Sequence, residues 1–160
     1  TYYYSLHGID LSTDMLNQAR QRLSKNDKSK GVVLGHANML ETRSLNLGPG
    51  SCAAVLNTFA LHHATPEQAE AAIRDWSLLL KDDGGCLYLG LWEGSGYMEE
   101  HHPGIKSILH SEKDARAWIE SAGLGIIMSR SQVETEFGNM NTLYLICQKK
   151  KKKIPEATNE

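Results

Sequence analysis

The sequence predicts an α/β protein, a three-layer sandwich whose mainly parallel sheet ends in an antiparallel pair of strands. Two observations carry this prediction. The strand-like runs are continuously apolar, which is typical of strands covered by helices on both faces, and segments with helical periodicity alternate with these runs. A turn-rich stretch, "EFGNMN", separates the last two runs and predicts the antiparallel pair. With 160 residues, of which 41% are hydrophobic, the chain is expected to form one packed domain.

The N-terminal part predicts a strand, a helix and a second strand. Residues 3–10 are expected to form the first strand and residues 32–35, "VVLG", a short buried second strand. Between them, Ser12 is a suitable N-cap for a helix over residues 12–24. Helical spacing places four apolar residues on one face of that helix, namely Met15, Leu16, Ala19 and Leu23.

The middle of the chain contains the clearest helix start. The run "CAAVLN", residues 52–57, predicts a buried strand. Thr65, Pro66 and Gln68 then combine an N-cap, a proline at the first helical position and a T-x-x-Q capping box. The helix that they begin leads to the next expected strand, "CLYLGLW", residues 86–92.

The last third predicts a loop, a helix and the antiparallel pair. Residues 93–110 show no clear periodicity, so we expect a surface loop or a variable acceptor pocket there. Ser111 begins a helix that Gly123 ends, and strands are expected at 124–130 and 142–148. We therefore expect one domain over residues 1–148, followed by a basic and disordered tail over 149–160.

Charge and cysteine content exclude several classes of protein. The net charge of −2 gives no strong field to attract nucleic acid or an anionic membrane. The five lysines Lys149–Lys153 are expected to be a solvated tail, with a nuclear-targeting or polyanion-binding patch as the alternative. Cys52, Cys86 and Cys147 show no pairing or CxxC pattern, which favours a reduced, cytoplasmic protein. No apolar stretch reaches membrane-spanning length.

Polar residues follow the expected strands at the places where ligands of such sheets bind. Ligands of open α/β sheets lie beyond the carboxyl ends of the strands. These ends are marked by Asp10, by residues 35–38, by Asn57 and by Glu93. We expect the binding site along this edge.

Five stretches, taken in order, carry a resemblance to a known family. They are "GIDLSTDMLNQAR", "VLGHANML", "AAVLNTFALHHATP", "AIRDWSLLLKDDGGCLYLG" and "SEKDARAWIESAGLGIIM". In this order and spacing they resemble the class I, Rossmann-like, seven-strand S-adenosylmethionine-dependent methyltransferases. The resemblance implies S-adenosyl-L-methionine as cofactor and transfer of its methyl group to a small-molecule acceptor.

The resemblance also implies roles for residues of the first strand and helix. Asp10 would accept hydrogen bonds from the ribose hydroxyls of the cofactor, and the alternative is a carboxylate that favours the start of the following helix. Leu11 and Met15 would form an apolar wall for the adenine, although Met15 equally fits a core position.

Later positions have weaker expected roles. His36 and Ala37 follow the second expected strand, where the family commonly has an acid at the position of His36. A neutral histidine can accept one hydrogen bond from the adenine amino group. Asn57 would lie near the methionine part of the cofactor, or would only cap its strand.

Catalysis itself has no obvious residue signature. Methyl transfer mainly requires alignment of the acceptor with the sulfonium; His62 or His63 is a conceivable base. The doublets His62-His63 and His101-His102 lack a chelating spacing, so we expect no metal site.

The glycine-rich cofactor loop of the family, G-x-G-x-G, is absent from the 160 residues. Its three G-x-G triplets, Gly48/Gly50, Gly94/Gly96 and Gly123/Gly125, do not join a first strand to a first helix. We therefore expect a fold that is incomplete at its N-terminus, a fragment that binds the cofactor poorly. Two alternatives are an inactive, partner-binding module and a nicotinamide-dinucleotide oxidoreductase, the latter disfavoured by the antiparallel pair.

Overall fold

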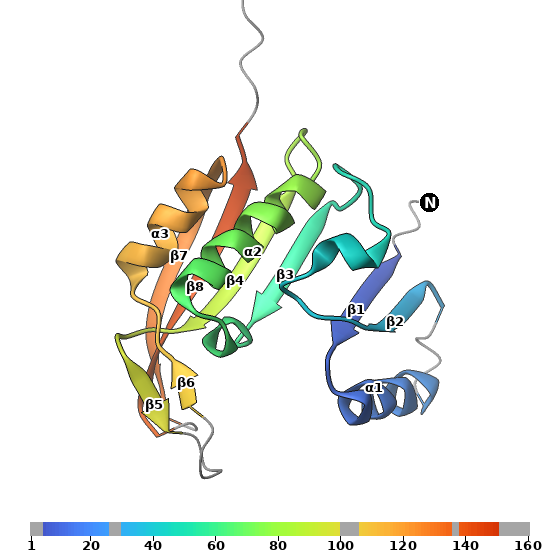
Figure 1. Ribbon diagram of the computed structural model, residues 1–160, viewed down its shortest axis with the longest axis horizontal. Coiled ribbons are helices and arrows are strands. Elements are labelled where there is room, and N and C mark those ends of the chain that lie inside the picture. The colour runs from blue at the N-terminus through green and yellow to red at the C-terminus, as the bar shows by residue number, and fades with distance from the viewer. Residues whose placement is uncertain (1–4, 26–29, 100–105, 136–137, 151–160) are drawn as a thin grey trace, which may run out of the picture. The chain divides into compact units, whose positions relative to one another are not determined.

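A computed structural model describes residues 5–25, 30–99, 106–135 and 138–150 (Figure 1). Its contacts divide the chain into two compact units, Thr1–Asn46 and Leu47–Glu160. The α/β class and the antiparallel terminal pair are both confirmed, and the strands form a mixed rather than a purely parallel arrangement.

The first unit pairs two short strands and carries one helix. Strand β1, Leu6–Asp10, runs parallel to β2, Val32–His36, and the two end level with one another because Asp10 is paired with His36. Helix α1 spans Thr13–Lys25, and the 3₁₀ helix η1 spans Thr42–Leu45. Of the four apolar residues expected on one face of α1, only Leu16 is fully buried.

The second unit is built on a four-stranded sheet. Its strands are β3, Ala54–Thr58, β4, Cys86–Trp92, β7, Leu124–Glu134, and β8, Met140–Lys149. The order across the sheet is β3-β4-β8-β7. β3 and β4 are parallel, whereas β8 is antiparallel to both β4 and β7. Strand β8, which comes last among the described strands, therefore lies inside the sheet.

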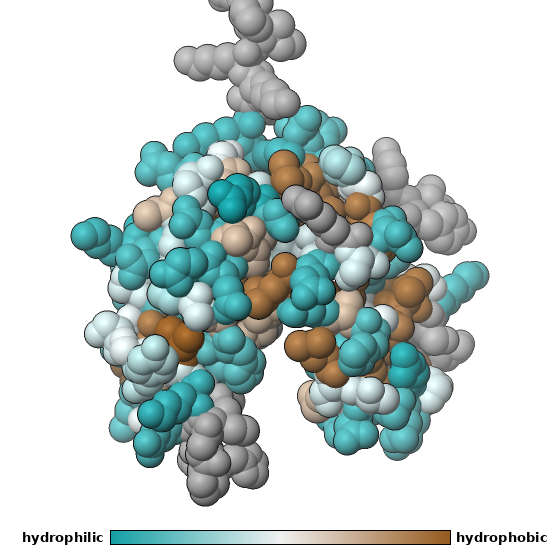
Figure 2. All heavy atoms as spheres, viewed as in Figure 1, coloured by the Kyte–Doolittle hydropathy of each residue, from teal (hydrophilic) through white to brown (hydrophobic). Residues whose placement is uncertain are grey.

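Helices α2, Pro66–Leu79, and α3, Glu112–Ser121, both lie on one face of this sheet, in front of it in Figure 1. The capping box predicted at Thr65 is present: its side chain accepts from the Gln68 N–H, and the Gln68 side chain accepts from the Thr65 N–H. Ser111 is the N-cap of α3, and its side chain accepts from the Asp114 N–H. Figure 2 shows mostly hydrophilic side chains on the solvent side of both helices.

The core of the second unit lies between these helices and the sheet. We call this side of the sheet the covered face. Six alternate residues of β4 and of the middle of β8 point into it and are at most 1% exposed. These residues are Leu87, Leu89, Leu91, Leu143, Leu145 and Cys147. Burial raises the pKa of the Cys147 thiol to about 12, because the thiolate loses its hydration there.

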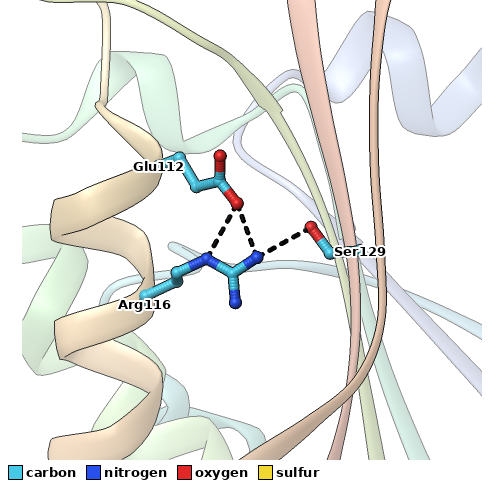
Figure 3. A network of polar contacts seen from close by, with 3 residues as sticks. All are labelled: Glu112, Arg116 and Ser129. Atoms are coloured by element: carbon cyan, nitrogen blue, oxygen red, sulfur yellow. Dashed lines mark hydrogen bonds and ion pairs between the residues drawn. The ribbon is translucent and has the colours of Figure 1, made fainter.

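A polar contact fixes the third helix to the edge of the sheet (Figure 3). The Arg116 Nε of α3 donates to Glu112 Oε1 at 2.8 Å, and Arg116 Nη2 donates to Ser129 Oγ of β7 at 3.1 Å. The pair is partly exposed, so it orients α3 more than it stabilises the fold.

Two details differ from the sequence predictions. The segment 93–110 was expected to be a loop, but it contains a small hairpin of β5, Tyr97–Glu99, and β6, Lys106–Ile108. Lys149, assigned to the tail, is the last residue of β8, and its Nζ donates to the Leu80 carbonyl at 2.9 Å and pairs with Asp82 at 2.8 Å. Residues 151–160 lie outside the described residues, and the domain boundary at 148 stays a prediction.

Candidate functional site

Asp10 ends β1 and makes the first turn into α1. Its Oδ1 accepts from the Ser12 N–H at 2.7 Å, and its carbonyl accepts from the Ala37 N–H at 3.2 Å. Ser12 Oγ in turn accepts from the Met15 N–H at 3.2 Å, which confirms Ser12 as the N-cap. Asp10 therefore has the structural role that was the alternative to ribose binding, because its carboxylate holds the start of the turn into α1. It leaves room for a ligand role as well, since a carboxylate has about four acceptor positions.

Leu11 and Met15 are the large apolar side chains beside Asp10 at the start of α1. Their exposed fractions are 60% and 52%, so of the two alternatives left open for Met15, the core position is not the one observed. Leu11 directly precedes the N-cap Ser12, and Met15 lies in the first turn of α1. An apolar surface next to a carboxylate is a suitable surface for a nucleoside.

His36 and Ala37 lie at the matching end of β2. His36 is exposed and is paired in register with Asp10. The Ala37 N–H already donates to the Asp10 carbonyl. Ala37 can therefore offer a ligand van der Waals contact, but its N–H is not available as a hydrogen-bond donor. Asn38, the next residue, closes a turn by accepting from the Leu40 N–H at 3.0 Å. Five of the six predicted cofactor residues thus lie in one unit, around two neighbouring strand ends.

Asn57, the sixth, lies in the second unit near the end of β3. It is 9% exposed, and its register with Leu89 places it on the covered face of the sheet. Two residues later the backbone adopts a left-handed conformation, because Phe59 has a φ of 51°. A left-handed conformation is uncommon for a bulky residue and is found preferentially at functional sites.

The exit of β3 continues into the 3₁₀ helix η2, Leu61–His63. The rings of His62 and His63 are 3.9 Å apart, and His63 is exposed. The buried His110 Nε2 lies 3.0 Å from the Leu61 carbonyl, and the His110 ring contacts Trp118. Among the described residues, no group of three or more His, Cys, Asp or Glu side chains is arranged to hold a metal ion; His101 and His102 lie outside them.

The family of the chain follows from a comparison with family models. Residues 1–84 match the model described as a methyltransferase domain. The chain belongs to this methyltransferase family. Methyltransferases of similar fold have been solved with SAM or with SAH bound. A comparison with curated proteins gives no match.

Solved structures share the fold of this methyltransferase at low identity. A SAM-dependent methyltransferase from Methanosarcina mazei is 16% identical with a TM-score of 0.79, and the match covers 93% of this chain and 84% of that one. Magnesium protoporphyrin IX methyltransferase from Synechocystis, solved with SAH, is 20% identical with a TM-score of 0.69, covering 91% and 64%. The [4+2]-cyclase SpnF is 14% identical with a TM-score of 0.73, covering 93% and 67%. The same fold thus also occurs in a protein named for another reaction.

Within the described parts of the chain, none of the helices combines the length and the apolar character needed to cross a bilayer.

Sequence reasoning missed the aromatic residues next to these strand ends. Phe59, Trp92 and Tyr144 come from three separate segments, and only the pairing of β8 with β4 brings them together. The single local signal is that Trp92 ends its strand.

Proposed function

We propose that this chain transfers the methyl group of S-adenosylmethionine to a small-molecule acceptor. The observation that carries the proposal is the family match over residues 1–84, which includes Asp10 at a strand end beside His36. A likeness to 1,6-didemethyltoxoflavin-N1-methyltransferase from Burkholderia thailandensis, a protein named for a small-molecule acceptor, supports the acceptor class.

The cofactor contacts begin with Asp10. Its Oδ1 is engaged by Ser12, so Oδ2 is the oxygen that accepts from the ribose hydroxyls. Leu11 and Met15 supply apolar contact to the adenine, and this accounts for two large apolar side chains that are more than half exposed. His36, as the neutral imidazole, accepts from the adenine amino group, and Ala37 contributes contact only.

Asn57 and the histidines of η2 are proposed for the reacting end. The Asn57 amide contacts the methionine part of the cofactor, and His62 or His63 removes a proton from the acceptor where its chemistry requires it. The protein otherwise has to align the acceptor with the methyl group, because the sulfonium already makes that group electrophilic.

The proposal includes weak cofactor binding by residues 1–160 alone. A glycine-rich loop lets backbone N–H groups approach a cofactor without interference from side chains, and these residues contain no G-x-G-x-G. A second candidate function, an inactive methyltransferase-like module that binds a partner protein, is favoured by the same feature and by His36 in place of an acid.

Saturation-transfer NMR of residues 1–160 with S-adenosylhomocysteine tests the proposal, since it detects millimolar binding. We expect saturation of the adenine and ribose protons, a loss of at least half of the effect in Asp10→Asn, and none for NAD. Asp14→Asn, an equal charge change at an exposed helix position, is the matched control. Transfer to NAD but not to S-adenosylhomocysteine would contradict the proposal, and transfer to neither would favour the inactive module. A micromolar affinity would contradict the weak-binding clause alone.

A further inference from the structure

Three aromatic side chains meet at the ends of β3 and β4, and we call them the aromatic cluster: Phe59, Trp92 and Tyr144. The Phe59 and Trp92 ring centroids are 4.5 Å apart with planes tilted by 31°. The Phe59 and Tyr144 centroids are 5.7 Å apart, edge to face at 85°. All three side chains are only half-buried. The cluster therefore presents aromatic surface to solvent.

The register places this cluster on the side of the sheet opposite α2 and α3, which we call the open face. Tyr144 is paired with Gly90 and Trp92 with Thr142, two residues along, whereas the leucines between them point into the covered face. Gly90 has no side chain, and the atoms nearest to the position of a Cβ there belong to Thr58, at 3.5 and 3.6 Å. The Phe59 N–H donates to the Gly90 carbonyl at 2.8 Å, which fixes Phe59 at the same point.

The conformation of Phe59 is what completes the cluster. In a continued strand, residue 59 would share the covered face with Asn57, because side chains alternate. The left-handed φ of 51° interrupts that alternation, and the ring instead contacts Trp92 and Tyr144. A bulky residue held in this sparsely populated region indicates a local structure kept for a purpose other than stability.

Tyr144 is held in place through its hydroxyl. Its O–H donates to Glu134 Oε1 at 3.1 Å, and the Gln132 side chain donates to the same oxygen. Partial burial, together with the negative charge and hydrogen bond of Glu134, raises the pKa of the Tyr144 phenol. The ring is thus neutral and fixed at physiological pH, as a stacking partner should be.

We propose that the aromatic cluster binds the methyl acceptor and that this acceptor is a planar, uncharged aromatic or heteroaromatic molecule. The inference rests on the proposed function, because it assigns the cluster to the acceptor of that reaction. Two of the three residues lie where a parallel strand ends, the edge of such a sheet at which ligands bind. Aromatic rings at fixed orientations prefer another ring, through offset or edge-to-face contact, to an aliphatic group of equal area.

The test uses 2-naphthol as the probe and its saturated analogue decahydro-2-naphthol as the matched ligand. Saturation-transfer NMR on residues 1–160, without cofactor, gives both affinities. We expect 2-naphthol to bind about fivefold more tightly than the analogue, the size of one aromatic contact. Equal binding of the two ligands would overturn the proposal, since it would show that apolar area alone is recognised.

Variants then locate the site. Phe59→Leu and Trp92→Leu each remove one ring, and each is expected to weaken 2-naphthol binding about fivefold or more. Tyr97→Leu removes a 71% exposed ring outside the cluster and is expected to change the affinity less than twofold. Full binding in either cluster variant whose circular-dichroism melting transition is retained would overturn the proposal. Because no cofactor is present, this outcome is independent of the S-adenosylhomocysteine experiment.

Discussion

Both faces of the four-stranded sheet carry large apolar residues, but the burial of these residues is very different. On the covered face, Leu89 and Leu145 are 0% exposed beneath α2 and α3. On the open face, Leu56 of β3 is 68% exposed and Met128 of β7 is 58% exposed. The strands alone do not distinguish the two sides. The covering helices decide which apolar residues stabilise the fold and which remain accessible to a ligand or a partner.

The largest expected difference between the faces is in cysteine reactivity. Cys147 lies on the covered face, with a thiol pKa of about 12, whereas Cys86 lies on the open face and is half-buried. Only the thiolate reacts, and at pH 8 about one Cys147 in ten thousand is ionised. Iodoacetamide followed by peptide mass spectrometry should show Cys147 reacting at least about a thousandfold more slowly than in the denatured chain.

The pH dependence of this reaction has a definite sign. Burial favours the neutral thiol of Cys147, so the thiolate is a small fraction at every pH below the raised pKa. The rate of Cys147 alkylation should therefore rise about tenfold per pH unit until the pH approaches that pKa. Cys86 should be modified before Cys147 in the folded protein. Equal rates for the two cysteines would show that the two faces are equally accessible and would break the comparison.

Truncation of a leucine should separate the faces in stability. Leu89→Ala leaves a cavity under the helices and is expected to lower the free energy of unfolding by about 2–5 kcal/mol. Leu56→Ala, the matched change on the open face, should cost less than about 0.5 kcal/mol. Urea unfolding followed by circular dichroism measures both, and similar costs would mean that Leu56 is buried in the folded protein.

The contact between the buried His110 and the Leu61 carbonyl connects the segment after β3 to the segment before α3, and a substitution of His110 tests its contribution to stability. His110→Ala removes the contact of Nε2 with the Leu61 carbonyl and leaves this buried acceptor without its partner, at a cost of about 1–3 kcal/mol. His63→Ala, at an exposed histidine two residues along the same turn from Leu61, is the control and should be nearly neutral. If the two variants unfolded at the same urea concentration, His110 would not hold this turn.

The smallest expected effect concerns the start of α2, one of the two helices that cover the sheet. Thr65→Ala removes the N-cap of α2 and half of its capping box, which should lower the free energy of unfolding by about 1 kcal/mol. Thr135→Ala, at an exposed position after β7, should have no measurable effect. A thermal melt compares them, and an unchanged midpoint for Thr65→Ala would show that packing alone sets the start of α2.

Local signals in the sequence predicted most elements of the fold. The capping box at Thr65, the N-cap at Ser111 and the run at 86–92 each specify their element within a few residues, and all three are present. Helices on both faces of the sheet were also expected, yet in the second unit α2 and α3 share one face. A continuous apolar run indicates that a strand can be buried, but it does not indicate which helix lies against which face.

The site was harder to predict because it depends on pairing between distant segments. Asp10 and His36 could be placed at strand ends from their positions alone, and the register confirms that they are neighbours. The aromatic cluster depends on β8 lying beside β4 and on a left-handed residue at Phe59. Neither feature has a local sequence pattern, since strand order is a long-range property and phenylalanine does not favour positive φ.

The position of β8 also determines when the four-stranded sheet can form during synthesis. During synthesis β4 and β7 leave the ribosome before β8, the strand that lies between them in the sheet and that ends at Lys149. Until then the leucines of β4 lack their neighbours, and the nascent chain exposes a sheet edge that can pair with another molecule. Completion of the second unit therefore waits for β8 and is governed by the slow formation of long-range contacts.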